Sequence, residues 1–309
     1  MDNNFFVTVD AGGTKTHAEA FLFNEISIKS IIKGPGNLAV NYNDAIQNIH
    51  DSISELVTSI DNKMKLKFIV IGCAGISVVP NVIDIQDQFS SFFHCSVLII
   101  SDILLALYSM VENTSSSAIF SIAGTGSVAM SIKNMKTTTI GGWGHLLGDE
   151  GSSYDIVIQF LKHFIYSYDS GNELSTLQKA FMKYVNINTP NDLKKIVYNH
   201  SKGDIAQYCK FLSNQSLQGN EESISYFIEA GKCIGSLIYR LYIRENMDSS
   251  CYLGVGGSLI ENNKYMKSEV ERFLLEHGIQ QPLNLVNEHI TLGGLHFVKC
   301  NHPYLLNIL

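Results

Sequence analysis

The feature that most constrains this 309-residue chain is an apolar run that stops abruptly at a glycine turn. Residues 118–123 predict a buried strand, and Gly124, Thr125 and Gly126 separate it from a second apolar-rich run at residues 128–132. Glycines let the backbone turn tightly and bring N–H groups close to a ligand, so this turn is a candidate phosphate cradle. The same pattern is also typical of an ordinary hairpin. The phosphate interpretation therefore depends on whether the theme recurs.

The theme recurs at the start of the chain, where an apolar strand at residues 5–9 meets Asp10. A returning strand is predicted at residues 18–23. Between the two strands lie Gly12, Gly13, Thr14 and Lys15. One interpretation is a second phosphate turn, with Asp10 orienting the waters of a Mg²⁺ ion and Lys15 approaching a phosphate. The other is a hairpin with a solvated aspartate. It is not a Walker A loop, because no glycine directly precedes Lys15 and no helical pattern follows.

The order of the predicted elements indicates an α/β protein with a duplicated unit. Residues 1–113 predict the order β-β-(β)-α-β-α-β-α, and a polar joint at residues 113–117 precedes a second β-rich start. Residues 153–246 are mainly helical in pattern, and a strand at residues 251–255 follows. We therefore predict one domain over residues 1–113 and another over residues 114–291 that carries a helical insertion. The last helix, at about residues 292–309, is expected to pack back on the first domain.

Asp102 stands where a buried strand meets a helix. Its plain structural role would be that of a helix N-cap. The functional alternative uses the same position, because ligands of α/β sheets bind at the carboxyl ends of strands. An ionised aspartate there could accept a proton from a substrate hydroxyl.

The least ordinary stretch is residues 141–152, which hold five glycines, the only tryptophan, a histidine and an acidic pair. The functional interpretation is a site for a polyhydroxylated ligand, in which Trp143 backs an apolar ring face and Asp149 accepts hydroxyl hydrogen bonds. The alternative is a glycine-rich loop with Trp143 as a packing plug. A further glycine turn, Gly256 and Gly257, follows the strand at residues 251–255 and suits a nucleotide or only a helix entry.

Composition excludes several classes of protein. The net charge is −7 and no basic stripe is visible, so nucleic acid is not an expected partner. No run approaches the roughly 18 apolar residues of a membrane span, and the N-terminus lacks a signal-peptide pattern. The six cysteines are scattered without CxxC or CxC spacing, which favours reduced thiols over a zinc or iron–sulfur site. We therefore expect a cytoplasmic location, no membrane partner and a small-molecule substrate.

Taken together, these stretches resemble the sugar kinase/Hsp70/actin superfamily. Within it the chain resembles the BadF/BadG/BcrA/BcrD ATPase group, and most closely its N-acetylglucosamine kinases. The resemblance spans nearly the whole chain in order: VDAGGTKT, CAG, SD at residues 101–102, SIAGTGS, GGWGHLLGDEGS, LGVGGS and TLGG. The GGWGHLLGDEGS string is highly specific, whereas the shorter glycine motifs indicate only ATP.

The resemblance implies two ribonuclease-H-like (actin-like ATPase) domains with a cleft between them, ATP and Mg²⁺ as cofactors, and transfer to the 6-hydroxyl of an amino sugar. It implies Asp102 as the catalytic base and Asp10 as the magnesium residue, acting through water. It implies that phosphates and adenosine bind at Gly12, Gly13, Thr14, Lys15, Gly124, Thr125, Gly126, Gly256 and Gly257. It implies a sugar site lined by Asn37, Asp102, Trp143, Gly144 and Asp149, with Asn41 as a rival to Asn37.

N-acetylglucosamine is the expected substrate. Glucosamine, muramic acid and N-acetylmuramic acid are the alternatives within kinases. Two other classes stay open: an ATPase activator of a partner enzyme, and a non-catalytic amino-sugar sensor. Cys73 has no spaced partner for a shared iron–sulfur cluster, which disfavours the activator. A homodimer is compatible with the resemblance, although no residue indicates one.

Overall fold

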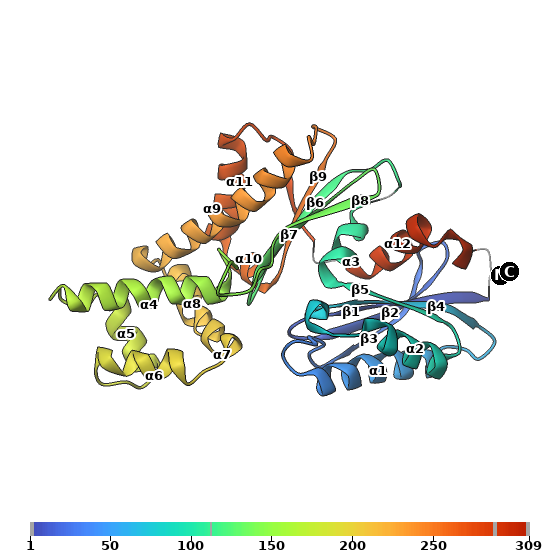
Figure 1. The fold of residues 1–309 in the computed structure, drawn as a ribbon, viewed down its shortest axis with the longest axis horizontal. Helices are drawn as coiled ribbons and strands as arrows, with labels where there is room; N and C mark the ends of the chain where they lie inside the picture. The colour runs from blue at the N-terminus through green and yellow to red at the C-terminus, as the bar shows by residue number, and fades with distance from the viewer. Residues whose placement is uncertain (1–2, 112, 287–288, 307–309) are drawn as a thin grey trace. The chain divides into compact units, whose positions relative to one another are not determined.

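The computed structural model describes residues 3–111, 113–286 and 289–306. The chain divides into two compact units, which are described separately (Figure 1). The first unit comprises Met1–Ala118, Ile132–Thr137 and Val286–Leu309, and the second comprises Ile119–Ser131 and Thr138–Leu285. Among the described residues, no helix combines the length and the apolar character that crossing a membrane requires.

The first unit is built on a five-stranded sheet with the strand order β3-β2-β1-β4-β5. Strand β1 pairs antiparallel with β2 and parallel with β4, and β4 pairs parallel with β5. This confirms the element order predicted for residues 1–113. The helices and strands of this unit are β1 (Asn4–Ala11), β2 (Thr16–Leu22), β3 (Ser27–Lys33), α1 (Tyr42–Thr58), β4 (Lys65–Cys73), α2 (Val82–Phe93), β5 (Ser96–Ser101), α3 (Asp102–Ser109) and α12 (Gly293–Asn301), with short 3₁₀ turns at Ile76–Val78, Ile290–Leu292 and Pro303–Leu305.

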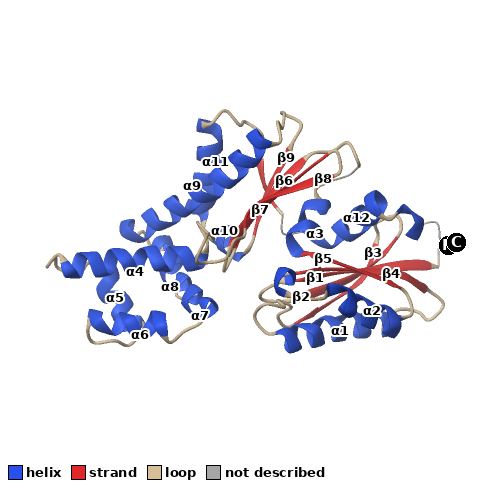
Figure 2. Cartoon of the chain, viewed as in Figure 1, coloured by secondary structure: helices blue, strands red, loops and turns tan. Residues whose placement is uncertain are grey.

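Helices cover both faces of this sheet (Figure 2). Helices α1 and α2 pack on one face, where alternate β1 residues such as Phe5 and Val7 meet Ile53. Helices α3 and α12 pack on the other, where Phe6 joins Leu105. Because both faces are buried, the central strands are apolar along most of their length.

The TLGG motif lets helix α12 approach the sheet closely. A Cβ atom at Gly293 would collide with the backbone oxygen of Leu105, and one at Gly294 would collide with the Thr8 hydroxyl. Thr291 also donates a 2.6 Å hydrogen bond to Glu19 on β2. These two glycines therefore have a packing role in this unit.

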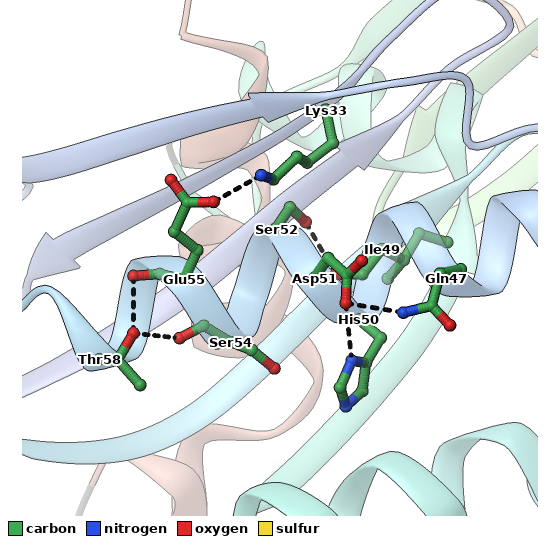
Figure 3. Close-up of polar contacts among 9 residues, drawn as sticks. All are labelled: Lys33, Gln47, Ile49, His50, Asp51, Ser52, Ser54, Glu55 and Thr58. Carbon is green, nitrogen blue, oxygen red and sulfur yellow. Dashed lines mark hydrogen bonds and ion pairs between the residues drawn. The ribbon is translucent and has the colours of Figure 1, made fainter.

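The outward face of α1 is polar and paired within itself (Figure 3). Asp51 accepts a 2.7 Å hydrogen bond from Gln47 and contacts His50 at 3.3 Å. Lys33 of β3 forms an ion pair with Glu55. Solvent screens such exposed pairs, so they contribute little to stability, and this face carries none of the predicted site residues.

The second unit repeats the sheet of the first. Its strand order is β10-β9-β6-β7-β8, so in both units the third, second, first, fourth and fifth strands lie side by side. This confirms the predicted duplication. The strands are β6 (Ala118–Ala123), β7 (Ser127–Lys133), β8 (Lys136–Gly141), β9 (Tyr252–Gly256) and β10 (Leu283–Leu285). Strand β8 was not predicted separately, because its three consecutive threonines lack an apolar alternation and the strand is mostly exposed.

A large helical cover packs on this second sheet. Its apolar core joins Ile119 of β6 to residues such as Phe160, Phe181 and Ile234. The helices are α4 (Ser153–Asp169), α5 (Thr176–Tyr184), α6 (Leu193–Tyr198), α7 (Lys202–Gln207), α8 (Cys209–Leu217), α9 (Glu221–Arg244), α10 (Ser258–Asn262) and α11 (Lys264–Glu276), with a 3₁₀ turn at Pro190–Asp192. The helical pattern predicted from residue 153 is confirmed.

Candidate functional site

The parallel strands of the first unit end in register at one edge of the sheet. Asp10 lies opposite Gly72, and the next row aligns Ala11, Cys73 and Ser101. Asp102 follows Ser101 directly as the first residue of α3. The edge formed by β1, β4 and β5 therefore brings together two carboxylates that are 92 positions apart in sequence, at the place where open α/β sheets bind ligands.

Asp10 and Asp102 also share a face of that sheet. Alternate residues of a strand point to the same face, and in β1 both Phe6 and Thr8 face α12. Asp10 is two residues further along and so faces the same way. Helix α3 packs on this face and begins with Asp102.

Asp102 is not the N-cap of its helix. Ser101 has that role, because its hydroxyl accepts a 3.3 Å hydrogen bond from the backbone N–H of Leu104. The Asp102 carboxylate accepts a 2.9 Å bond from the N–H of Ile103. Burial raises the pKa of Asp102, and these backbone bonds only partly offset the effect. A carboxylate with a raised pKa is better suited to accept a proton near neutral pH.

Cys73 lies between the two carboxylates in the strand register and is buried. Burial raises the pKa of its thiol strongly, and the nearby charges of Asp102 and Asp10 raise it further. The thiol therefore stays protonated. A protonated thiol is a poor nucleophile, and the free form of Cys73 agrees with the expectation of reduced thiols.

The first glycine turn connects β1 to β2 and is open. The N–H of Gly12 bonds to the carbonyl of Lys15 at 2.9 Å, and the carbonyl of Gly12 accepts a 2.9 Å bond from Gly36. Residues 13–15, including the predicted phosphate residues Gly13, Thr14 and Lys15, are exposed. A Cβ atom at Gly13 would meet nothing within 4 Å. The fold thus leaves this turn room for a ligand.

Asn37 is held beside the same sheet edge by the loop that follows β3. Its side chain accepts a 2.9 Å hydrogen bond from the N–H of Ala39, and Leu38 is bonded to Ala74. Gly75 has a φ of +73°, and a Cβ atom there would collide with the Asn37 side chain. The CAG motif therefore packs against Asn37.

The rival residue, Asn41, serves as a helix cap. It is the N-cap of α1, and its side chain accepts a hydrogen bond from the N–H of Asp44 at 3.3 Å. Asp44 engages both the amide oxygen and the amide nitrogen of Asn41, at 3.3 and 2.6 Å, and this makes Asn41 the weaker candidate for a ligand contact.

The second glycine turn connects β6 to β7 in the second unit and is braced. The N–H of Gly124 bonds to the carbonyl of Gly126 at 2.9 Å, while Thr125 is exposed. The Ser127 hydroxyl donates a 2.7 Å bond to the carbonyl of Glu150. The turn is therefore tied to the loop that contains the GGWGHLLGDEGS string.

That loop exposes its apolar side chains. Trp143 is 75% exposed, and Leu146 and Leu147 are 83% and 79% exposed. The packing-plug alternative for Trp143 is therefore wrong. Gly144 has a φ of +80°, a backbone conformation that favours glycine. The His145 ring makes an edge-to-face contact with the Tyr154 ring, with 4.9 Å between the ring centroids. This contact explains the position of His145 without a ligand.

Asp149, in contrast, is buried within this loop. One carboxylate oxygen accepts a 3.2 Å bond from the N–H of Ser127, and the other accepts a 2.6 Å bond from the Lys202 ammonium. Its φ of 64° is unusual for a residue other than glycine. Sequence reasoning missed Lys202, because a lysine 53 positions away on a helical insertion carries no local signal.

The third turn, Gly256 and Gly257, lies against the second. Gly257 has a φ of +97°, and a Cβ atom there would lie 2.5 Å from the carbonyl oxygen of Ala123, next to Gly124. Its N–H donates a 2.9 Å bond to Glu261. The second unit thus brings the predicted adenosine and phosphate turns together.

Among the described residues, no group of three or more His, Cys, Asp or Glu side chains could hold a metal ion. A single carboxylate such as Asp10 is enough for Mg²⁺, which keeps several waters and binds substrate phosphates.

Two sheets of one strand order, each with a glycine turn after its first strand, define an actin-like ATPase fold. A Porphyromonas gingivalis structure, provisionally named an N-acetylglucosamine kinase, matches with a TM-score of 0.71 at 18% identity and covers 94% of this chain and 98% of its own.

The chain belongs to the BadF/BadG/BcrA/BcrD ATPase family, whose model matches residues 7–283. A Clostridium acetobutylicum protein named N-acetylmuramic acid/N-acetylglucosamine kinase is 24% identical over 277 residues, which cover 87% of this chain and 90% of that protein. An N-acetyl-D-glucosamine kinase from Dictyostelium discoideum is 23% identical over 265 residues, which cover 80% and 82%.

Proposed function

We propose that this protein is an ATP-dependent kinase that phosphorylates the 6-hydroxyl of an amino sugar, with N-acetylglucosamine as the first candidate. The observation that carries the proposal is Asp102, a carboxylate with a raised pKa at the carboxyl edge of a parallel sheet. Membership of an ATPase family supports it, as do two relatives named as amino-sugar kinases, which are matched over 90% and 82% of their own lengths.

In this proposal the first unit supplies the base. Asp102 takes the proton of the sugar hydroxyl as the oxygen attacks the γ-phosphorus of ATP, and ADP leaves. Ser101 fixes the start of α3, and so holds the Asp102 backbone in place. Proton transfer of this kind contributes about 10²–10⁴-fold to rate.

Asp10 would hold a Mg²⁺ ion, through water, at the same edge. The bound ion would neutralise charge on the phosphate oxygens during transfer. Gly12, Gly13, Thr14 and Lys15 would contact phosphates through the open turn. Backbone N–H groups there are suited to an anion, because nothing in the fold occupies the space beside Gly13.

The second unit would hold the nucleotide and part of the sugar. Gly124, Thr125 and Gly126 would contact phosphate, and Gly256 and Gly257 the adenosine. The exposed Trp143 ring would cover an apolar sugar face, with Gly144 beside it. Asp149 would accept a sugar hydroxyl, and Asn37 of the first unit would contact the sugar as well. A carboxylate oxygen has two lone pairs, so the bonds to Ser127 and Lys202 do not exhaust Asp149.

N-acetylmuramic acid is the second substrate candidate, because the Clostridium relative carries both sugars in its name. The test is a panel in which the purified protein is incubated with ATP, Mg²⁺ and one sugar at a time. The panel contains N-acetylglucosamine, N-acetylmuramic acid, glucosamine, muramic acid and glucose. We expect ADP release that depends on an N-acetylated amino sugar, with a product 80 Da heavier than the sugar, the mass that a phosphoryl group adds.

Two outcomes would overturn the proposal. ADP release at the same rate with and without every sugar would favour an ATPase that activates a partner enzyme. Sugar binding with no ADP release would favour a non-catalytic sensor.

A further inference from the structure

Lys202 is a cation that the helical insertion places beside the second glycine turn. It is the first residue of α7, and its ammonium lies 2.6 Å from the Asp149 carboxylate. The Asp149 side chain is only 4% exposed, whereas that of Lys202 is 28% exposed. Of the two charges, the ammonium is therefore the more exposed to a ligand in solution.

Gly126 shows how close this pair lies to the turn. A Cβ atom at Gly126 would be 2.9 Å from the Asp149 carboxylate and 3.1 Å from the Lys202 ammonium. A side chain at position 126 would therefore displace one member of the pair. A buried carboxylate bonded to both Ser127 and Lys202 fixes the ammonium with respect to the turn backbone.

The chemistry of an ammonium suits a phosphate at this place. It has three N–H donors and no acceptor, and the bond to Asp149 uses one of them. Lysine binds phosphate as a point charge, and hydrogen bonds to ionised groups are about twice as strong as neutral ones.

We infer that Lys202 is a phosphate-binding residue for the nucleotide, and that Asp149 is the residue that positions it. The inference rests on the proposed function for the identity of the nucleotide. The alternative is that the pair only fastens α7 to the turn, without touching a ligand.

A phosphate-binding role and a purely structural role of Lys202 are distinguished by comparing ligands with and without phosphates. ATP, ADP and adenosine are titrated by calorimetry into the full chain and into Lys202→Gln and Lys202→Arg. Both variants can still donate to Asp149, but only the arginine keeps the charge. We expect K202Q to weaken ATP and ADP about 10–100-fold, the effect of losing a hydrogen bond to a charged group. Adenosine should change less than about twofold, and K202R should recover most of the ATP affinity.

Lys210→Gln is the matched control, because Lys210 is an exposed lysine on the neighbouring helix α8 and should leave every affinity unchanged. The inference would be overturned if K202Q weakened the binding of adenosine and ATP equally, or if it weakened neither. A wild-type chain that does not bind ATP would overturn it as well. A wild-type chain that binds ATP but makes no sugar phosphate would overturn only the proposed function, because the titration does not depend on turnover.

Discussion

The two glycine turns occupy the same position in the two units, after the first strand of each sheet, yet the fold holds them differently. The first turn, between β1 and β2, has backbone bonds that join Gly12 to Lys15 and to Gly36, and a Cβ atom at Gly13 would meet nothing within 4 Å. The second turn, between β6 and β7, is braced by the buried Asp149 and by Lys202. The carboxylates of Asp10 and Asp102 lie at the sheet edge where the first turn begins, and the turn of Gly256 and Gly257 lies against the second.

This difference suggests a division of tasks between duplicated units. The first unit places titratable carboxylates next to an open turn, which suits proton transfer and a metal ion. The second packs two glycine turns together and fixes a cation beside them, which suits a nucleotide. The same sheet can serve both tasks because loops after strand ends, rather than the strands themselves, carry the chemistry.

The largest effect is expected for Asp102→Asn. Loss of the base should lower kcat about 10²–10⁴-fold while sugar and ATP binding stay near wild type. Steady-state kinetics and calorimetry with both substrates measure this. Asp84→Asn is the control, because Asp84 is also an acid in the first turn of a helix on this sheet.

The thermal stability of the Asp102→Asn variant shows whether a loss of activity comes from catalysis or from folding. Because burial raises the pKa of Asp102 in the folded state, its ionised form lowers the free energy of unfolding at neutral pH. D102N should therefore unfold at the same temperature as wild type or a higher one. Near-wild-type turnover in this variant would show that the base lies elsewhere.

The next effect concerns pH. Asp102 must be ionised to accept a proton, and its pKa is raised by burial. The rate should therefore fall at a higher pH than an ordinary aspartate would cause, by about tenfold for each pH unit below that pKa. A profile of kcat/KM against pH measures the effect. A rate that stays flat down to the usual pKa of aspartate, about 3.9, would contradict the assignment.

The smallest effect is expected for two glycine substitutions, one in each glycine turn, which test whether the two turns are held differently. Gly126→Ala forces Asp149 or Lys202 to move and should lower the free energy of unfolding by about 1–3 kcal/mol, as overpacking does. Gly13→Ala meets no neighbour and should change it by less than about 0.5 kcal/mol. Chemical denaturation of both variants measures the difference. Equal losses would mean that the two turns are held alike.

Much of the fold could be predicted from the sequence because its signals are local. Apolar runs bounded by glycines located β1 and β6, and the helical pattern from residue 153 located the start of α4. Cap positions were less predictable, because Asn41 and Ser101 compete with polar neighbours that could serve equally well. The exposed strand β8 lacks the apolar alternation that marks a strand.

For the site, motif order located the turns and both aspartates, because strand ends in a parallel sheet fall at one edge. Contacts between distant segments could not be predicted in this way. The bond from Lys202 to Asp149 joins α7 to a loop after β8, and the glycines of TLGG proved to serve the packing of α12. Their roles depend on the assembled unit rather than on nearby residues.

The most direct test of the account is the position of the phosphate in the product. The protein is incubated with ATP, Mg²⁺ and N-acetylglucosamine, and the product is examined by phosphorus–proton correlation NMR. Coupling of phosphorus to the two hydrogens on carbon 6 is the predicted result. Coupling to the hydrogen on carbon 1, or inorganic phosphate with unmodified sugar, would contradict it.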